Sequence, residues 1–354
     1  MKKSLLLITA IVAFFVAGCD IEPIPNDKDN TQTENPEKPE NPDPENPDPE
    51  NPENPNPENP DPENPENPDK PSSGSQNISY AWFELPAMTD ENKDGMLDSG
   101  DQLYYAYHLC AGKEKAAGGR IARNYTVCYS GKHHCPVWVA APRHDMFVGG
   151  SGRTDAYKID PDIPAEIQYK SKSTGGGCNK GHMLGSAERT SSRPTNQQVF
   201  YYTNIAPQLS SGFNTGGGGW NLLEDFVDDL VVKDTLYEVI GCHFEKYTDG
   251  YGKTVSPKTI SFGGRDDVSM PTMFYYALLR TKKGNTGKSV ENCTADELQC
   301  VAFVRSHTNE LKGQKPTSKE LMSISDLEKL TGFTFFTNVP NAPKNTYKAS
   351  DWGL

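Results

Sequence analysis

The sequence has no excess of basic residues, no C-x-x-C pair and no long apolar run after its first twenty residues. Without such a run, nothing in the remainder is a candidate for a membrane-spanning helix. The 35 basic and 48 acidic residues exclude a globally basic nucleic-acid-binding protein. The missing C-x-x-C spacing disfavours a metal-thiolate site, so partial disulfide pairing is the favoured role of the cysteines in an exported chain.

The acidity belongs to the N-terminal quarter of the chain. Residues 1–75 hold 5 Lys/Arg against 17 Asp/Glu, whereas residues 76–354 hold 30 against 31. This nearly neutral part is long enough to bury a substantial core. A site for a polyanion on it must therefore be local.

The first residues predict an exported and lipid-anchored chain. Two lysines at 2–3 precede an apolar stretch at 5–16, as in a signal peptide. The following Val16-Ala17-Gly18-Cys19 resembles the lipobox of bacterial lipoproteins. The resemblance implies cleavage before Cys19, lipid attachment to its thiol and an extracytoplasmic position on a bacterial membrane, most simply the outer membrane on its periplasmic or surface side. An ordinary secretory signal is the alternative.

An acidic, proline-rich segment follows. Glu-Asn-Pro and Asp-Pro units repeat over residues 34–70, and 14 of the 28 prolines lie at 36–71. Such a segment cannot form a core and should be an extended, disordered spacer, about 120 Å long at ~3.1 Å per residue. The chain is thus divided into a signal peptide (1–18), a lipidated tether (19–75) and a folded domain (76–354). The folded domain keeps seven cysteines, an odd number that leaves at least one unpaired.

The folded domain alternates between strand-like and helical patterns. Apolar residues recur at helical spacing from Trp220 to Val231, and Ser325-Asp-Leu-Glu328 predicts a capped helix that ends at Gly332. The absence of a regular βαβ rhythm favours an α+β fold with a mixed or antiparallel sheet. Strands are predicted at residues 79–85, 102–109, 125–129, 136–141, 200–205, 236–242 and 274–279.

Chemistry-bearing residues concentrate between 178 and 224. Lys180-Gly181-His182 follows three glycines, and Asn204, Asn214 and Glu224 come later. These residues can supply a general base, carboxamide ligands for a hard cation and a carboxylate that orients water. Hydrolysis of a phosphodiester needs that combination. A structural Gly-His pair beside loops is the alternative.

Four ordered motifs extend this interpretation. Asn179-Lys-Gly-His182, Tyr202-Thr-Asn-Ile-Ala-Pro-Gln208, Phe213-Asn214 and Trp220-Asn-Leu-Leu-Glu224 together resemble the DNA/RNA non-specific endonucleases of the ββα-metal (His-Me finger) class. The resemblance covers about residues 120–340. It implies a metal-dependent endonuclease with a ββα-metal motif that cleaves DNA and RNA and leaves 5′-phosphate ends. The implied cofactor is Mg²⁺, with Mn²⁺ as an alternative.

The resemblance also implies a role for each motif residue. His182 would be the general base, and Asn214 the one direct protein ligand of the metal. Glu224 would orient a metal-bound water. Asn204 would place the histidine or the substrate phosphate, and Arg153 would stabilise charge on the pentacovalent phosphorus.

Substrate contact is expected from a local basic cluster of Lys180 and Arg189 beside Arg153. Two departures from the family pattern bear on activity. Asn179-Lys180 replaces Asp-Arg, so a negative charge and a planar guanidinium are both lost. The interval from Asn214 to Trp220 is two residues longer than usual, and we expect the extra glycines (216–219) to bulge from a loop. The alternative function is a surface module on the same fold that binds nucleic acid with weakened catalysis, or a calcium-dependent adhesion module.

One acidic segment is independent of these motifs. Residues 90–101 place oxygen donors at positions 1, 3, 5, 9 and 12 of an EF-hand-like loop, with Asp101 in place of the final glutamate. Ca²⁺ binding there would stiffen the N-terminal edge of the domain. A solvated acidic turn explains the pattern equally well.

Overall fold

The computed structural model of this chain describes residues 82–87 and 103–354. Four predicted features lie outside the described residues: the signal peptide, the lipid anchor at Cys19, the tether and the candidate calcium loop. Within the described ranges, no helix combines the length and the apolarity needed to cross a bilayer.

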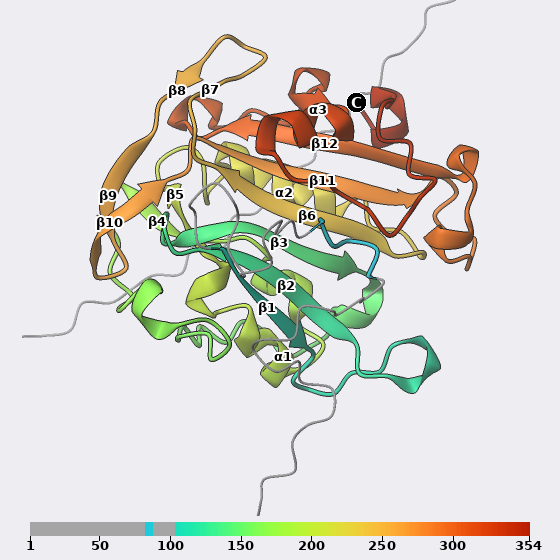
Figure 1. Cartoon of the computed structure of the whole chain (residues 1–354), viewed down its shortest axis with the longest axis horizontal. Helices are drawn as coiled ribbons and strands as arrows, with labels where there is room; N and C mark the ends of the chain where they lie inside the picture. Colours follow the sequence, from blue (N-terminus) through green and yellow to red (C-terminus); the bar gives the residue numbers. More distant parts are fainter. Residues whose placement is uncertain (1–81, 88–102) are drawn as a thin grey trace, which may run out of the picture. The chain divides into compact units, whose positions relative to one another are not determined.

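Seven antiparallel strands form the main sheet, in the order β1-β2-β3-β6-β11-β12-β13 (Figure 1). The antiparallel sheet with few helices confirms the predicted α+β class. The strands are β1 (Leu103–Leu109), β2 (Arg123–Ser130), β3 (Cys135–Arg143), β6 (Leu236–His243), β11 (Met273–Thr281), β12 (Leu298–Ser306) and β13 (Leu321–Met322).

Three two-stranded sheets lie outside the main sheet. They are β4 (Cys178–His182) with β5 (Ile205–Leu209), β9 (Lys258–Phe262) with β10 (Arg265–Met270), and β7 (Tyr247–Thr248) with β8 (Thr254–Val255). A second apolar cluster joins Cys178 and Ile205 to Phe262 and Val268. The β9–β10 hairpin therefore supports the β4–β5 pair, beside which it lies at the left of Figure 1.

Among the described residues, the α-helices are α1 (Arg193–Gln198), α2 (Gly219–Asp228) and α3 (Ile324–Thr331). The α2 helix lies behind β6 and β11 in Figure 1, and the Trp220 ring stacks on Tyr276 of β11 at 5.0 Å. The preceding residue of β11, Tyr275, contacts Phe335 at 5.9 Å, on the opposite face of the sheet. Because β11 is covered on both faces, its sequence is a continuous apolar run rather than an alternating one.

Several predicted elements are confirmed, with shifted ends, and two differ. Residues 82–87 form a turn instead of a strand. Residues 202–204 form a 3₁₀ turn, so β5 begins only at Ile205. The α3 helix ends at Gly332 as predicted, with φ +78°, but its N-cap is Ser323, whose Oγ accepts from the Asp326 amide at 3.0 Å.

The predicted disulfide pairing is not seen in the part of the chain that the structure describes. No disulfide joins its seven cysteines, and every one of them is buried. Burial raises the pKa of the Cys110 and Cys300 thiols to about 12. The cysteines therefore serve as small apolar side chains inside the core.

Candidate active site

The pairing of β4 with β5 brings the first two motifs together. Their register places His182 opposite Ile205 and Asn179 opposite Gln208. The chain then passes through residues 210–218 into α2, which carries Glu224. Two antiparallel strands followed by a helix are the ββα arrangement that the motifs predict.

His182 is positioned as an unprotonated imidazole. Its ring is partly exposed and packs against Phe200 and Tyr157, at centroid distances of 4.8 and 5.9 Å. Its Nε2 atom is buried and has no hydrogen-bond partner among the described residues. Burial, followed by the charge of Arg153, lowers the pKa of His182 to about 3. The ring is therefore neutral at neutral pH, as a general base requires.

Asn214 is held in one orientation by a buried glutamine. Its Nδ2 donates to Oε1 of Gln208, and Gln208 Nε2 donates to the His182 carbonyl oxygen at 3.3 Å. Asn214 Oδ1 accepts from Asn179 Nδ2 at 3.3 Å. Gln208 thus links the backbone of His182 to the side-chain amide of Asn214, the predicted metal ligand. Because the amide nitrogen of Asn214 faces Gln208, its oxygen faces away from Gln208.

Gly181 is required by the position of Gln208. A Cβ at residue 181 would lie 2.1 Å from the Gln208 side-chain carbon Cδ. Glycine between Lys180 and His182 therefore permits close approach of the two strands at this point.

Glu224 lies in an environment of excess negative charge. Burial, and then the neighbouring Asp228 and Asp225, raise the pKa of Glu224 to about 8, whereas Arg143 lowers it. A divalent cation nearby would offset this repulsion and lower the pKa. The amide oxygen of Asn214, completed by water that the Glu224 carboxylate would orient, suits a hard cation such as Mg²⁺. The residues present therefore fit the predicted metal.

The negative charge beside Glu224 is partly offset by a residue that the motifs do not contain. Buried Arg143, at the end of β3, pairs with Glu188 at 3.0 Å, Glu238 at 3.3 Å and Asp228 at 2.6 Å. Its three partners come from different parts of the chain, so no local sequence pattern identifies the network.

The loop before α2 accommodates the glycine insertion as predicted. Gly216 and Gly217 have φ of +66° and +78°, and a Cβ on either would meet no atom within 4 Å. Phe213 still stacks on Trp220 at 5.8 Å. The extra residues therefore bulge outward, and the start of α2 stays packed.

Arg189 corrects the predicted basic cluster. It has no exposed surface, and its guanidinium donates to Asn124 Oδ1 and to the Pro142 and Glu188 carbonyl oxygens at 2.8–2.9 Å. A side chain that is enclosed in this way has no access to a substrate phosphate. Arg189 instead joins β2 and β3 to the segment before α1.

Asn204 is a positioning residue. It is fully buried, its Oδ1 accepts from the Leu184 amide at 3.0 Å, and its Nδ2 donates to the Leu184 and Val199 carbonyl oxygens at 2.9 and 2.8 Å. It fixes the chain directly after His182. Its burial excludes the alternative in which it contacts the substrate phosphate.

Arg153 and Lys180 lie on the same side as the His182 ring. The half-exposed Arg153 guanidinium is 4.9 Å from the Phe200 centroid and donates to Tyr157 Oη at 3.1 Å. The Lys180 ammonium is 5.3 Å from the Tyr157 centroid. Both cations therefore border the candidate base.

A separate group of residues could hold a metal ion. The ligand atoms of His108, Asp160 and Asp162 lie within 4.8 Å of one another. His108 Nε2 is 2.9 Å from Asp160 Oδ2, which also accepts from Thr203 Oγ1 at 2.6 Å. These bonds already connect the partners, and they anchor the 160–168 loop next to Asn204.

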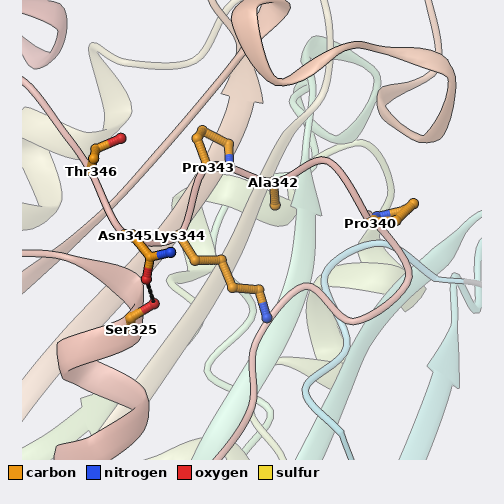
Figure 2. Close-up of a pocket in the computed structure, with 7 residues that line it drawn as sticks. All are labelled: Ser325, Pro340, Ala342, Pro343, Lys344, Asn345 and Thr346. Atoms are coloured by element: carbon orange, nitrogen blue, oxygen red, sulfur yellow. Dashed lines mark hydrogen bonds between the residues drawn. The ribbon is translucent and has the colours of Figure 1, made fainter.

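A surface pocket lies away from all of these residues. Figure 2 shows it at the start of α3, where Ser325 Oγ donates to Asn345 Oδ1 at 2.6 Å. Its one charged residue, Lys344, pairs with Glu328 at 2.9 Å. No predicted site residue is among those that line it, which are Ser325, Pro340, Ala342, Pro343, Lys344, Asn345 and Thr346.

The chain is similar to several known nucleases. A family model described as DNA/RNA non-specific endonuclease matches residues 111–342. Mitochondrial nuclease EXOG of Homo sapiens is 26% identical over 258 residues, which are 72% of this chain and 65% of the relative. A nuclease of Nostoc sp. is 28% identical over 226 residues, which are 62% of this chain and 74% of that protein.

The alignments do not span whole relatives. EXOG of Mus musculus aligns over 60% of this chain and 55% of its own length, so the chain covers less than two thirds of the first two relatives. The crystal structure of a complex of EndoG with its inhibitor EndoGI has a TM-score of 0.49 and 22% identity, and it covers 61% of this chain and 84% of that chain.

Proposed function

The chain belongs to the DNA/RNA non-specific endonuclease family, and on that premise we propose that it hydrolyses phosphodiester bonds of DNA and RNA with a divalent cation, Mg²⁺ or Mn²⁺. The observation that carries the proposal is the link through Gln208 between the neutral base His182 and the ligand Asn214.

The residues of this chain divide the reaction between them. His182 accepts a proton from the attacking water, whose oxygen forms the new bond to phosphorus. Arg153 stabilises the negative charge that develops on the phosphate. Glu224 orients water in the site, and Asn214 holds the cation. A bound cation would neutralise charge on the phosphate and on the leaving 3′ oxygen, and this oxygen takes its proton from a water molecule in the site, which leaves a 3′ hydroxyl and a 5′-phosphate end.

Asn179 motivates the alternative function. Its amide donates to the oxygen of Asn214 that would bind the metal, which an unprotonated aspartate could not do. A module that binds nucleic acid without cleaving it would result if this bond persisted in the presence of the cation.

Cation dependence tests the proposal. The purified full chain is incubated with supercoiled plasmid and with RNA, in Mg²⁺, Mn²⁺ or EDTA. We expect cleavage of both substrates with either metal, no cleavage in EDTA, and 5′-phosphate ends. Retarded plasmid without nicking in every metal would favour the binding module, and cleavage that persists in EDTA would exclude the proposed chemistry.

Gly181→Ala is expected to reduce cleavage about 10–100-fold, because the new methyl group displaces the glutamine that aligns both Asn214 and the His182 carbonyl. Overpacking should also cost about 1–3 kcal/mol of unfolding free energy. Initial rates and urea unfolding measure the two effects. Gly150→Ala is the matched control, because a Cβ there meets nothing within 4 Å. Equal rates for the two variants would show that Gln208 does not align the site.

We also propose that the chain is attached to the membrane through a lipid on Cys19. The support is the sequence Val16-Ala17-Gly18-Cys19 at the end of the apolar stretch. In that case the proline-rich segment would hold the endonuclease domain away from the membrane, in an extracytoplasmic compartment where environmental nucleic acid is within reach.

A further inference from the structure

Three cations converge on one aromatic ring beside His182. The Lys180 and Lys172 ammonium groups lie 5.3 and 5.7 Å from the Tyr157 centroid, and Arg153 Nη2 donates to the Tyr157 hydroxyl at 3.1 Å. We call these four residues the Tyr157 cluster. Lys172 belongs to none of the motifs that identify the family.

The charge of the cluster is only partly compensated. Asp155 pairs with Arg153 at 2.8 Å and is the acid that acts on both Tyr157 and His182. Three positive charges against one negative charge leave an excess that attracts an anion. The ring offsets part of the repulsion between the cations, because its negative face attracts them.

The position of the cluster indicates which anion it attracts. The Tyr157 centroid is 5.9 Å from that of His182, so a strand whose phosphate is held at His182 passes over or beside the ring. Lys172 is exposed, and Lys180 Nζ donates to the Lys172 carbonyl oxygen at 3.3 Å, which ties the two lysines together. A single lysine lacks the two-point contact that an arginine makes with phosphate, and a second lysine restores a second contact.

We propose that the Tyr157 cluster binds the sugar-phosphate backbone of the nucleic acid beside the cleavage position, that Lys172 makes a phosphate contact of its own, and that Tyr157 positions the cations. This inference rests on the proposed function. In the substrate site, Lys172 takes the place of Arg189, which is enclosed. The second lysine also explains how a chain with lysine at position 180 still binds the substrate phosphate.

Binding without turnover tests the inference. The dissociation constant for a short fluorescent DNA duplex is measured in EDTA over a range of salt concentrations, with every variant in the His182→Ala background. Lys172→Gln is expected to weaken binding about three- to tenfold at low salt and to reduce the slope of log K against log salt by about 0.9. Lys283→Gln, an exposed lysine in the turn after β11, is the charge-matched control and should change neither quantity by more than the experimental error.

Two tyrosine variants separate positioning from folding. Tyr157→Phe keeps the ring face and loses only the hydrogen bond to Arg153. Its salt slope should therefore differ less from that of the His182→Ala background than the slope of Tyr157→Leu does. Tyr157→Leu should reproduce the reduced slope of Lys172→Gln, and a loss of structure would instead appear in its thermal melt.

The outcomes also separate this inference from the proposed function. If the wild-type chain cleaves plasmid but Lys172→Gln behaves as Lys283→Gln, the inference is overturned and the proposed function stands. If the wild-type chain cleaves nothing but Lys172→Gln still lowers the salt slope, the cluster binds nucleic acid and the catalytic proposal fails.

Discussion

His182→Ala is expected to lower the rate of phosphodiester cleavage by about 10²–10⁴-fold, the usual contribution of a general base. The pKa of His182 is lowered to about 3 by burial and by Arg153, so the wild-type ring is unprotonated throughout the neutral range. The loss should therefore be the same at every neutral pH. Initial rates on supercoiled plasmid at saturating Mg²⁺ measure it.

Folding does not explain such a loss. His182 Nε2 has no hydrogen-bond partner in the described part of the chain, so its removal leaves no buried group unpaired. The variant should keep its DNA affinity in EDTA and most of its thermal stability. His144→Ala, a partly exposed histidine at a 3₁₀ turn, is the control and should cleave at the wild-type rate. A His182→Ala variant that retains more than about a tenth of the rate would remove this residue from the mechanism.

The second large effect on cleavage is expected for Asn214→Ala. The substitution deletes the predicted ligand oxygen and the amide group that donates to Gln208. We therefore expect the Mg²⁺ concentration for half-maximal rate to rise about 10–100-fold. Rates measured across a Mg²⁺ titration check this result. Because the defect concerns the cation, part of the activity should return at high Mg²⁺, which distinguishes this variant from His182→Ala.

Asn292→Ala is the matched control for the ligand, because Asn292 is exposed in the short turn before Cys293. Its Mg²⁺ requirement should equal that of the wild type. If Asn214→Ala also has an unchanged requirement while its rate falls, Asn214 supports the fold of the site without holding the cation, and the ligand must be sought elsewhere, first at the His108, Asp160 and Asp162 group.

The sequence predicted the elements whose patterns are local. β2, β3, β6 and β11 follow from runs of apolar and aromatic residues, and α2 follows from its helical spacing. Residues 200–205 have the same aromatic composition, but residues 202–204 form a 3₁₀ turn that is held by the bonds of Asn204 to the Leu184 and Val199 backbone. The bond to Leu184 joins residues that are twenty positions apart, so no local sequence pattern reveals it.

The site residues also divide into those that local patterns mark and those whose surroundings depend on distant parts of the chain. His182, Asn214 and Glu224 lie in ordered motifs, so the sequence alone marks them as candidates. Arg189 was misassigned because a cation near a motif has the same sequence signature whether it is exposed or enclosed, and its enclosure depends on Asn124 and Pro142.

Two contributors needed the fold to be recognised. Gln208 was part of a quoted motif, but its link between His182 and Asn214 becomes visible only through the register of β4 and β5. Lys172 lies in no motif, and only its approach to Tyr157 marks it.

The central claim is that His182 and Asn214 serve one reaction at one site. A double-mutant cycle tests it most directly, with cleavage rates at one fixed Mg²⁺ concentration, just sufficient for the wild type, for His182→Ala, Asn214→Ala and the double variant. We expect strong non-additivity, with the double variant no slower than the slower single variant, as for residues that act as a unit. Losses that multiply in full would contradict it, because they would show that the two residues act independently.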